Sequence, residues 1–182
     1  MSERVETLIE TEAIQRRVRE LGAQITEEYQ GRELTLIAVL KGAYVFLADL
    51  ARQIDLPLTV DFLGLTSYGD KTETSGVVRI THDLTQPVKE RDVLIVEDIV
   101  DSGLTMNFLL ENLRTRLPRS VKVCAFLDKP ARRRVPVHVD YAGFEIEDRF
   151  VIGYGLDYAG RYRNLPFLGV LEKSGEGSED ES

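Results

Sequence analysis

Short, almost continuous apolar runs are the feature of this sequence that most restricts its fold. They occur at residues 34–40 (LTLIAVL), 92–96 (DVLIV) and 121–127 (VKVCAFL). Runs of this length that lack a polar/apolar alternation are typical of strands buried on both faces. Because such strands need a layer of helices on each side, the runs predict a mainly parallel sheet.

Helical patterns and further strand candidates fill the intervals between these runs. Apolar residues at spacings of three and four predict a helix over 11–28, carried by Ile14, Val18, Leu21 and Ile25. Helices are also expected at 43–54 and at 103–117, where Pro118 stops the second. Strands are expected at 58–65, at 77–81 and as two or three short runs within 137–154, and the polar stretch 66–76 is expected to be a mobile loop. This alternation of strands and helices predicts an α/β domain.

The composition fits one soluble domain. The chain has 182 residues, 43% hydrophobic and 30% charged, which is enough for one sizeable core. Its net charge of −8 argues against a general nucleic-acid binder, which must neutralise phosphates. No apolar run could span a membrane and the first six residues lack a signal core, so no membrane association or export is expected. The single cysteine, Cys124, cannot form an internal disulfide, and a cytoplasmic location is expected.

The end of the chain differs in composition from the rest. Residues 173–182 contain no apolar side chain and are rich in acidic residues. A segment of this kind has nothing to bury and is expected to be a disordered acidic tail. Residues 1–172 are therefore expected to form a single domain.

The segment 93–105 (VLIVEDIVDSGLT) carries the strongest chemical signal. Two adjacent carboxylates, Glu97 and Asp98, are followed by Asp101 and by a small turn, residues 102–105, that opens a helix. The carboxyl end of a parallel strand is where open α/β sheets bind ligands, and a glycine turn at a helix N-terminus suits a phosphate. Neighbouring carboxylates suit ribose hydroxyls or Mg²⁺ and its waters. The alternative is a strand end with solvated acids and a capped helix, but the parts together favour a ribose-phosphate site.

This segment resembles the phosphoribosyl-diphosphate signature of the type I phosphoribosyltransferases. Further motifs between residues 34 and 171, in the family's order, are similar to its hypoxanthine-guanine branch. The resemblance implies a mainly parallel central sheet flanked by helices, with a small hood subdomain formed by N-terminal and C-terminal segments. It also implies a purine salvage enzyme that transfers the 5-phosphoribosyl group from phosphoribosyl diphosphate to hypoxanthine or guanine, giving IMP or GMP and pyrophosphate. Mg²⁺ would be the cofactor, and a homodimer or homotetramer would be the assembly.

For the diphosphate substrate, the resemblance assigns roles to several groups of residues. Pyrophosphate would be bound by Leu40, Lys41 and Gly42, with a non-proline cis bond between the first two, and by Arg163. Glu97 and Asp98 would hold the ribose hydroxyls, and Asp101 would be the acid/base at the purine N7. The 5′-phosphate would be bound by the turn of Ser102, Gly103, Leu104 and Thr105. A flexible loop that starts at Ser67 and Tyr68 would close over the reaction centre and exclude water.

For the base, the resemblance assigns four residues. Lys129 would donate to the 6-oxo group, because an ammonium cannot accept a hydrogen bond from a 6-amino group. Phe150 would stack on the purine, and Val151 would bind it through its backbone. Asp157 would lie near the base and share the Mg²⁺ with Glu97 and Asp98. Without the resemblance, each of these residues would be interpreted as core, turn or surface.

Other features receive a structural interpretation. His82 and His138 have no partner at a useful metal or triad spacing, and the run Arg132-Arg133-Arg134 is interpreted as a solvated basic turn or a contact with a neighbouring subunit. Three alternative functions stay open. They are a response-regulator receiver, whose acidic strand would come first in the chain, a nucleotide-sensing regulator that binds DNA or RNA, and a transferase for xanthine, adenine or a pyrimidine.

Overall fold

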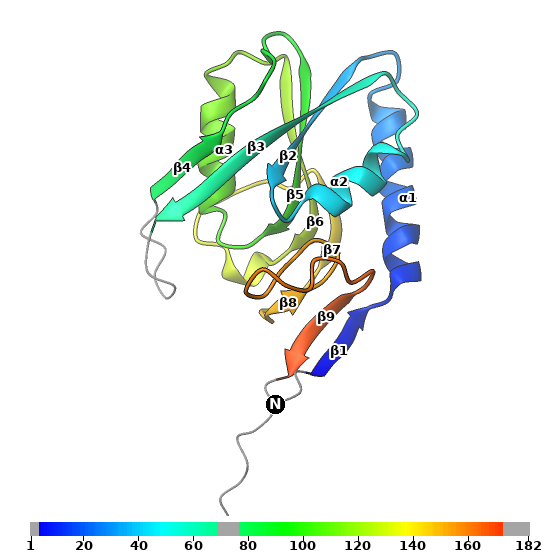
Figure 1. The fold of residues 1–182 in the computed structure, drawn as a ribbon. Coiled ribbons are helices and arrows are strands. Elements are labelled where there is room, and N and C mark those ends of the chain that lie inside the picture. The colour runs from blue at the N-terminus through cyan, green and yellow to red at the C-terminus, as the bar shows by residue number, and fades with distance from the viewer. Residues whose placement is uncertain (1–3, 69–76, 173–182) are drawn as a thin grey trace, which may run out of the picture.

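A six-stranded sheet forms the centre of the molecule (Figure 1). In this computed structural model, residues 4–68 and 77–172 are described. The strand order is β4-β3-β2-β5-β6-β7, and neighbouring strands run parallel except for the antiparallel pair of β3 and β4. The strands are β2 (Leu34–Leu40), β3 (Leu58–Tyr68), β4 (Val77–His82), β5 (Asp92–Val100), β6 (Ser120–Asp128) and β7 (Tyr141–Glu145). The expected mainly parallel sheet is confirmed.

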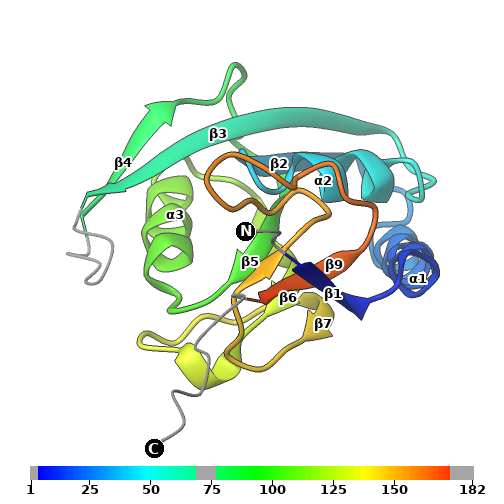
Figure 2. The same cartoon turned by 60° about the horizontal axis from the view of Figure 1, so that its bottom comes forward.

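Helices cover both faces of this sheet, as the apolar runs required. The helices α1 (Thr11–Glu28) and α2 (Tyr44–Ala51) pack on one face, and α3 (Leu104–Arg114) packs on the other (Figure 2). Successive residues of β2 point to opposite sides: Leu36 joins the core under α1 and α2, and Ile37 joins the core under α3. Both residues are completely buried.

A small second sheet joins the two ends of the described chain. Its order is β1-β9-β8, with β1 (Arg4–Ile9), β8 (Val151–Ile152) and β9 (Leu168–Glu172) all antiparallel to their neighbours. In Figure 1 this sheet lies below the ends towards which the arrows of β2 and β3 point. The sequence patterns did not predict β1 or β9, because most of β1 is exposed and its partner is more than 150 residues away along the chain.

Several element boundaries differ from the expected ones. β5 does not end at residue 96 but continues through the acidic pair to Val100, because β6 remains paired with it to that point. α2 is shorter than 43–54. β3 continues to Tyr68, so Ser67 and Tyr68 end a strand paired with β4 rather than begin a loop at residue 66. The rest of the expected loop (69–76) and the expected tail (173–182) lie outside the described residues.

No helix in the part of the chain that the structure describes is long and apolar enough to cross a membrane.

Candidate active site

Three neighbouring parallel strands bring the predicted residues to one edge of the sheet. β2 ends at Leu40, β5 at Val100 and β6 at Asp128, and these strands are adjacent in the order β2-β5-β6. The carboxyl ends of adjacent parallel strands meet at one edge, so the residues that follow them are close in space. Lys129 shows this directly, since its backbone N–H donates to the carbonyl of Val100 at 2.9 Å.

The turn after β2 contacts the acidic pair. The Leu40–Lys41 peptide bond is cis, as the resemblance implied, and the Lys41 side chain is exposed. Gly42 is buried directly against Asp98, because a Cβ atom added to this glycine would lie 1.5 Å from Oδ2 of that carboxylate. The two motifs, separated by more than 50 residues in the sequence, therefore form one surface.

Glu97 and Asp98 form a coupled pair of carboxyl groups at the end of β5. Burial, and then the charge of Asp98, raise the pKa of Glu97 well above its ordinary value. Burial also raises the pKa of Asp98. Hydrogen bonding to Glu97 and to the backbone N–H of Ile99, the latter at 2.8 Å, lowers this pKa and offsets part of the effect of burial. Without a ligand, burial therefore favours the neutral form of Glu97 beside Asp98.

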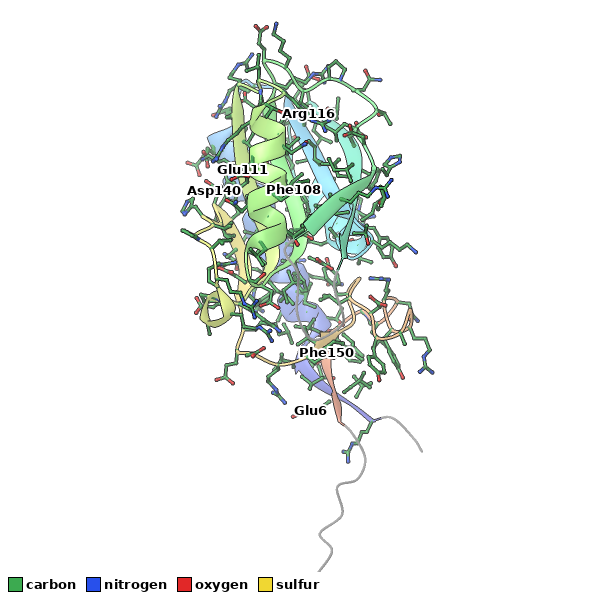
Figure 3. All side chains as sticks on the ribbon, turned by 90° about the vertical axis from the view of Figure 1, so that its left-hand side faces the viewer. Glu6, Phe108, Glu111, Arg116, Asp140 and Phe150 are labelled. Atoms are coloured by element: carbon green, nitrogen blue, oxygen red, sulfur yellow. The ribbon has the colours of Figure 1, made fainter. Side chains whose placement is uncertain are left out.

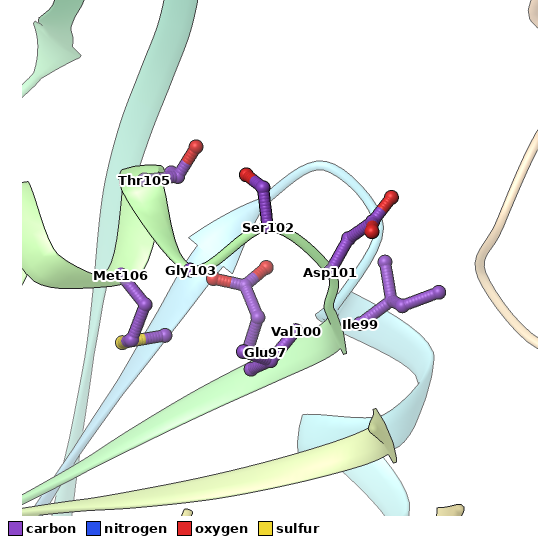
Figure 4. Close-up of a pocket in the computed structure, with 8 residues that line it drawn as sticks. All are labelled: Glu97, Ile99, Val100, Asp101, Ser102, Gly103, Thr105 and Met106. Atoms are coloured by element: carbon purple, nitrogen blue, oxygen red, sulfur yellow. The ribbon is translucent and has the colours of Figure 1, made fainter. Parts of the chain in front are cut away.

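The turn before α3 surrounds a pocket. Gly103 has a positive φ of 84°, a conformation that favours glycine, and caps α3. The amides of the first helical turn have no intrahelical acceptor; that of Leu104 donates weakly to the Ser102 hydroxyl oxygen at 3.4 Å, and a helix end of this kind can donate to an anion. Figure 4 shows the pocket, about 160 Å³ in volume, with the Ser102 and Thr105 hydroxyls and the Glu97 carboxyl around it.

A second pocket adjoins the first. It has a volume of about 220 Å³ and is lined by Asp98, Ile99, Asp101, Lys129, Phe150, Val151, Leu156 and Asp157. Ile99 and Asp101 line both pockets. The structure thus brings together the residues expected at the sugar and those expected at the base, with Asp101 at the boundary between them.

Lys129 is almost fully buried beside this second pocket. Its ammonium group donates a 2.6 Å hydrogen bond to the backbone carbonyl of Arg149. A lysine is seldom buried to this extent unless it is paired, and this bond fixes the position of its charge.

Phe150 and Val151 differ strongly in exposure. The Phe150 ring is 57% exposed and forms an edge-to-face contact with the Tyr158 ring, at 5.7 Å between centroids, whereas Val151 is buried in β8. Phe150 lies beside the small sheet in Figure 3. An aromatic ring so exposed next to a pocket offers a face on which a flat ligand can stack.

Asp157 is held by its own loop. Arg163 forms an ion pair with its Oδ1 at 2.7 Å, and the N–H of Gly160 donates to its Oδ2 at 2.8 Å. Arg163 also donates to the carbonyl of Gly155 at 2.6 Å. These contacts join the expected diphosphate residue Arg163 to the expected base residue Asp157. Among the described residues, no group of three or more metal-binding side chains forms a closed metal site.

The arginine run 132–134 is partly solvated, with Arg132 and Arg134 exposed, but it also contacts the signature loop, which its sequence did not indicate. Arg133 donates to the carbonyl of Asp101 at 3.0 Å and pairs with the Asp128 carboxylate. The side chain of Arg132 forms an ion pair with Asp101. The backbone N–H of Arg134 donates to the carbonyl of Ser102 at 2.9 Å. A run of charged residues gives no sign of these contacts, which depend on the position of the loop after β6.

Comparisons with known proteins agree with this geometry. A model of the phosphoribosyl transferase domain matches residues 4–159. The chain is 52% identical over 165 residues to the hypoxanthine-guanine phosphoribosyltransferase of Bacillus subtilis, covering 91% of this chain and 92% of that protein. It is 47% identical over 173 residues to the hypoxanthine phosphoribosyltransferase of Salmonella typhimurium, covering 94% and 97%. The solved hypoxanthine phosphoribosyltransferase of Staphylococcus aureus has a TM-score of 0.89 at 44% identity, over 92% of this chain and 91% of that one. The chain therefore belongs to the type I phosphoribosyltransferase family.

Proposed function

We propose that this enzyme transfers the 5-phosphoribosyl group from phosphoribosyl diphosphate to hypoxanthine or guanine, giving IMP or GMP and pyrophosphate. The observation that carries this proposal is the pair of adjoining pockets that share Ile99 and Asp101. A transfer to a base needs the anomeric carbon of the sugar and a nitrogen of the base to meet at one point. The shared wall supplies such a point.

The residues around the first pocket would bind and orient the sugar. The 5′-phosphate would accept hydrogen bonds from the amides and hydroxyls of residues 102–105, and Glu97 and Asp98 would accept hydrogen bonds from the ribose hydroxyls. Anchoring the phosphate away from the reacting carbon supplies positioning energy. The transition state carries positive charge on the ribose and negative charge on the departing pyrophosphate. Lys41, Arg163 and backbone N–H groups would stabilise the pyrophosphate.

The residues around the second pocket would hold the base. Phe150 would stack on the purine, Val151 would bind it through its backbone, and Lys129 would donate to its 6-oxo group. Asp101 would hold or release the proton at N7, since it lies at the wall that the two pockets share. Ser67 and Tyr68 are the last residues of β3, which ends at the carboxyl edge of the sheet. We expect the closing loop to begin there.

The donor groups fit Mg²⁺. This ion is usually held by one or two carboxylates together with substrate oxygens and water, rather than by a closed protein cage. Glu97 and Asp98 form a pair of neighbouring acids whose burial raises the pKa of both, so a cation beside them would stabilise their ionised forms. We expect these two residues and Asp157 to hold the ion with the diphosphate. When bound, it would neutralise charge on the leaving group.

Product formation tests the proposal. The purified protein is incubated with phosphoribosyl diphosphate and Mg²⁺ together with hypoxanthine, guanine, xanthine or adenine, and nucleotides are separated by chromatography. We expect IMP and GMP to form, and no AMP. Omission of phosphoribosyl diphosphate is the control. No product with any purine would overturn the proposal. Sedimentation of the same sample measures whether two or four copies of the chain assemble.

A further inference from the structure

Arg132 bridges two acidic residues, Asp148 and Asp101, of which Asp101 lines the second pocket, here called the base pocket. It ends a short 3-10 turn, Pro130–Arg132, directly after Lys129. Its Nε lies 3.1 Å from Oδ1 of Asp101, and its Nη1 donates to the Asp148 carboxylate at 3.1 and 3.3 Å. Two nitrogens of the planar guanidinium thus lie close to two different acids, an arrangement that a lysine ammonium cannot reproduce with the same geometry.

The contact between Arg132 and Asp101 places a positive charge beside a carboxylate oxygen that has no hydrogen-bond donor among the described residues. The Oδ1 atom of Asp101 is buried, and within the described residues it accepts no hydrogen bond. Arg132 Nε is close enough for an ion pair but its N–H is not directed at this oxygen as a hydrogen bond requires. The Asp101 side chain as a whole is 42% exposed, so water screens this contact and it contributes little to folding, but the guanidinium charge still favours this position of the buried oxygen.

The contact between Arg132 and Asp148 connects Arg132 to Lys129, which lines the base pocket. Oδ1 of Asp148 lies 3.9 Å from Nζ of Lys129, whose ammonium is also held by the Arg149 carbonyl. A chain of charges thus runs from Asp101 through Arg132 and Asp148 to Lys129. Its two ends line the same pocket. N7 and the 6-oxo group are adjacent acceptors on one edge of a 6-oxopurine, so the two ends of the chain face neighbouring atoms of the expected base.

We propose that Arg132 is a positioning residue for the transfer reaction: it holds the Asp101 carboxylate at the wall between the two pockets and links it to the Lys129 side of the base pocket. This inference rests on the proposed function. Because the side chains of Arg132 and Asp148 are each about half exposed, their ion pair contributes little to folding. The effect of Arg132 therefore falls on turnover rather than on stability.

Arg132→Gln and Arg132→Lys test the position of Asp101, and Arg134→Gln is the matched control. Arg134 belongs to the same arginine run, has an exposed side chain and keeps its backbone bond to Ser102 after substitution. We expect Arg132→Gln to lower kcat by about 10- to 100-fold, a usual result of misplacing a reacting group. The KM for phosphoribosyl diphosphate and the Tm should stay close to those of the parent protein. Arg132→Lys should give an intermediate kcat, and Arg134→Gln should match the parent.

A double-substitution cycle tests whether Arg132 acts through Asp101. In an Asp101→Asn background, Arg132→Gln should cause no further loss of kcat beyond about twofold, since the group it positions has gone. Equal fold losses in both backgrounds, or equal kinetics for the Arg132 and Arg134 variants, would overturn the inference. The parent protein separates the two proposals: if it forms no nucleotide, the function itself fails, and if it does, these comparisons concern Arg132 alone.

Discussion

Gly42 and Asp98 are in such close contact that no side chain fits between them. A Cβ atom on Gly42 would lie 1.5 Å from Oδ2 and 2.4 Å from Cγ of Asp98. Gly155 packs closely against the carbonyl of Gly42, because a Cβ atom added to Gly155 would lie 2.1 Å from that oxygen. The turn after β2, the acidic end of β5 and the loop after β8 therefore form a single packed unit at the carboxyl edge of the sheet.

Gly42→Ala should damage this unit directly. The methyl group would displace Asp98 or the turn, and overpacking of this kind costs about 1–3 kcal/mol of unfolding free energy. We expect kcat/KM for phosphoribosyl diphosphate to fall by about 100-fold, because the acids and the turn both move. Gly31→Ala is the control, since nothing lies within 4 Å of a Cβ there, although φ is +77°. It should lose stability and keep its kinetics, and normal kinetics for Gly42→Ala would contradict the close contact.

Glu97→Gln should stabilise the ligand-free protein in a pH-dependent way. The pKa of Glu97 is raised in the folded state, so the folded protein binds a proton that the unfolded chain releases at an ordinary glutamate pKa near 4.5. The stabilisation from protonated Glu97 is present below that value and is lost as the pH rises through the folded pKa. Glutamine stays neutral and can still donate to Asp98. In urea unfolding without Mg²⁺, the free energy of unfolding of the variant should therefore exceed that of the parent by more at pH 8 than at pH 5. The activity of the variant should fall.

Asp101→Asn should slow turnover far more than it weakens the binding of phosphoribosyl diphosphate. Asparagine has a similar shape but cannot take up or release the proton, and a positioned acid/base contributes about 10²–10⁴-fold to rate. Steady-state kinetics and direct titration of the diphosphate separate the two effects. Equal losses in kcat and in binding would count against an acid/base role.

Lys129→Met should impair recognition of 6-oxopurines. The ammonium that Arg149 holds in place would be lost, and hydrogen bonds to charged groups contribute about 1.5–3 kcal/mol. We expect kcat/KM for hypoxanthine to fall by about 10- to 100-fold, with the affinity for phosphoribosyl diphosphate retained. Lys89→Met, at an exposed lysine, is the control. Full activity of Lys129→Met would show that the base is recognised elsewhere.

Phe150→Leu should weaken base binding without weakening the fold. The ring is 57% exposed, so its loss removes little buried area. Aromatic stacking contributes about 0.5–1.5 kcal/mol beyond burial, which corresponds to a rise of about two- to tenfold in the KM for the base. Leu117→Ala, another exposed apolar residue, should leave both KM and Tm unchanged. A large fall in Tm for Phe150→Leu would instead indicate a structural role.

Much of the central sheet could be predicted because local patterns encode it. The residues of β2 and of β6 are apolar on both faces, and α1 has its apolar stripe at helical spacing. The signature segment was also readable, because the acids, the glycine and the hydroxyl residues that it needs follow one another within 93–105. Lys129, Phe150, Asp157 and Arg163 needed the resemblance to a family, since each alone has an ordinary structural interpretation.

The sequence by itself determined the type of each central element and the chemistry available after β5. Both depend on residues that are neighbours in the chain. Only the tertiary structure decided which distant groups meet. It paired β1 with β9 across almost the whole chain, seated Gly42 against Asp98 and brought Arg132 to Asp101. These contacts depend on strand order and on the course of loops, and a periodic pattern carries no information about either.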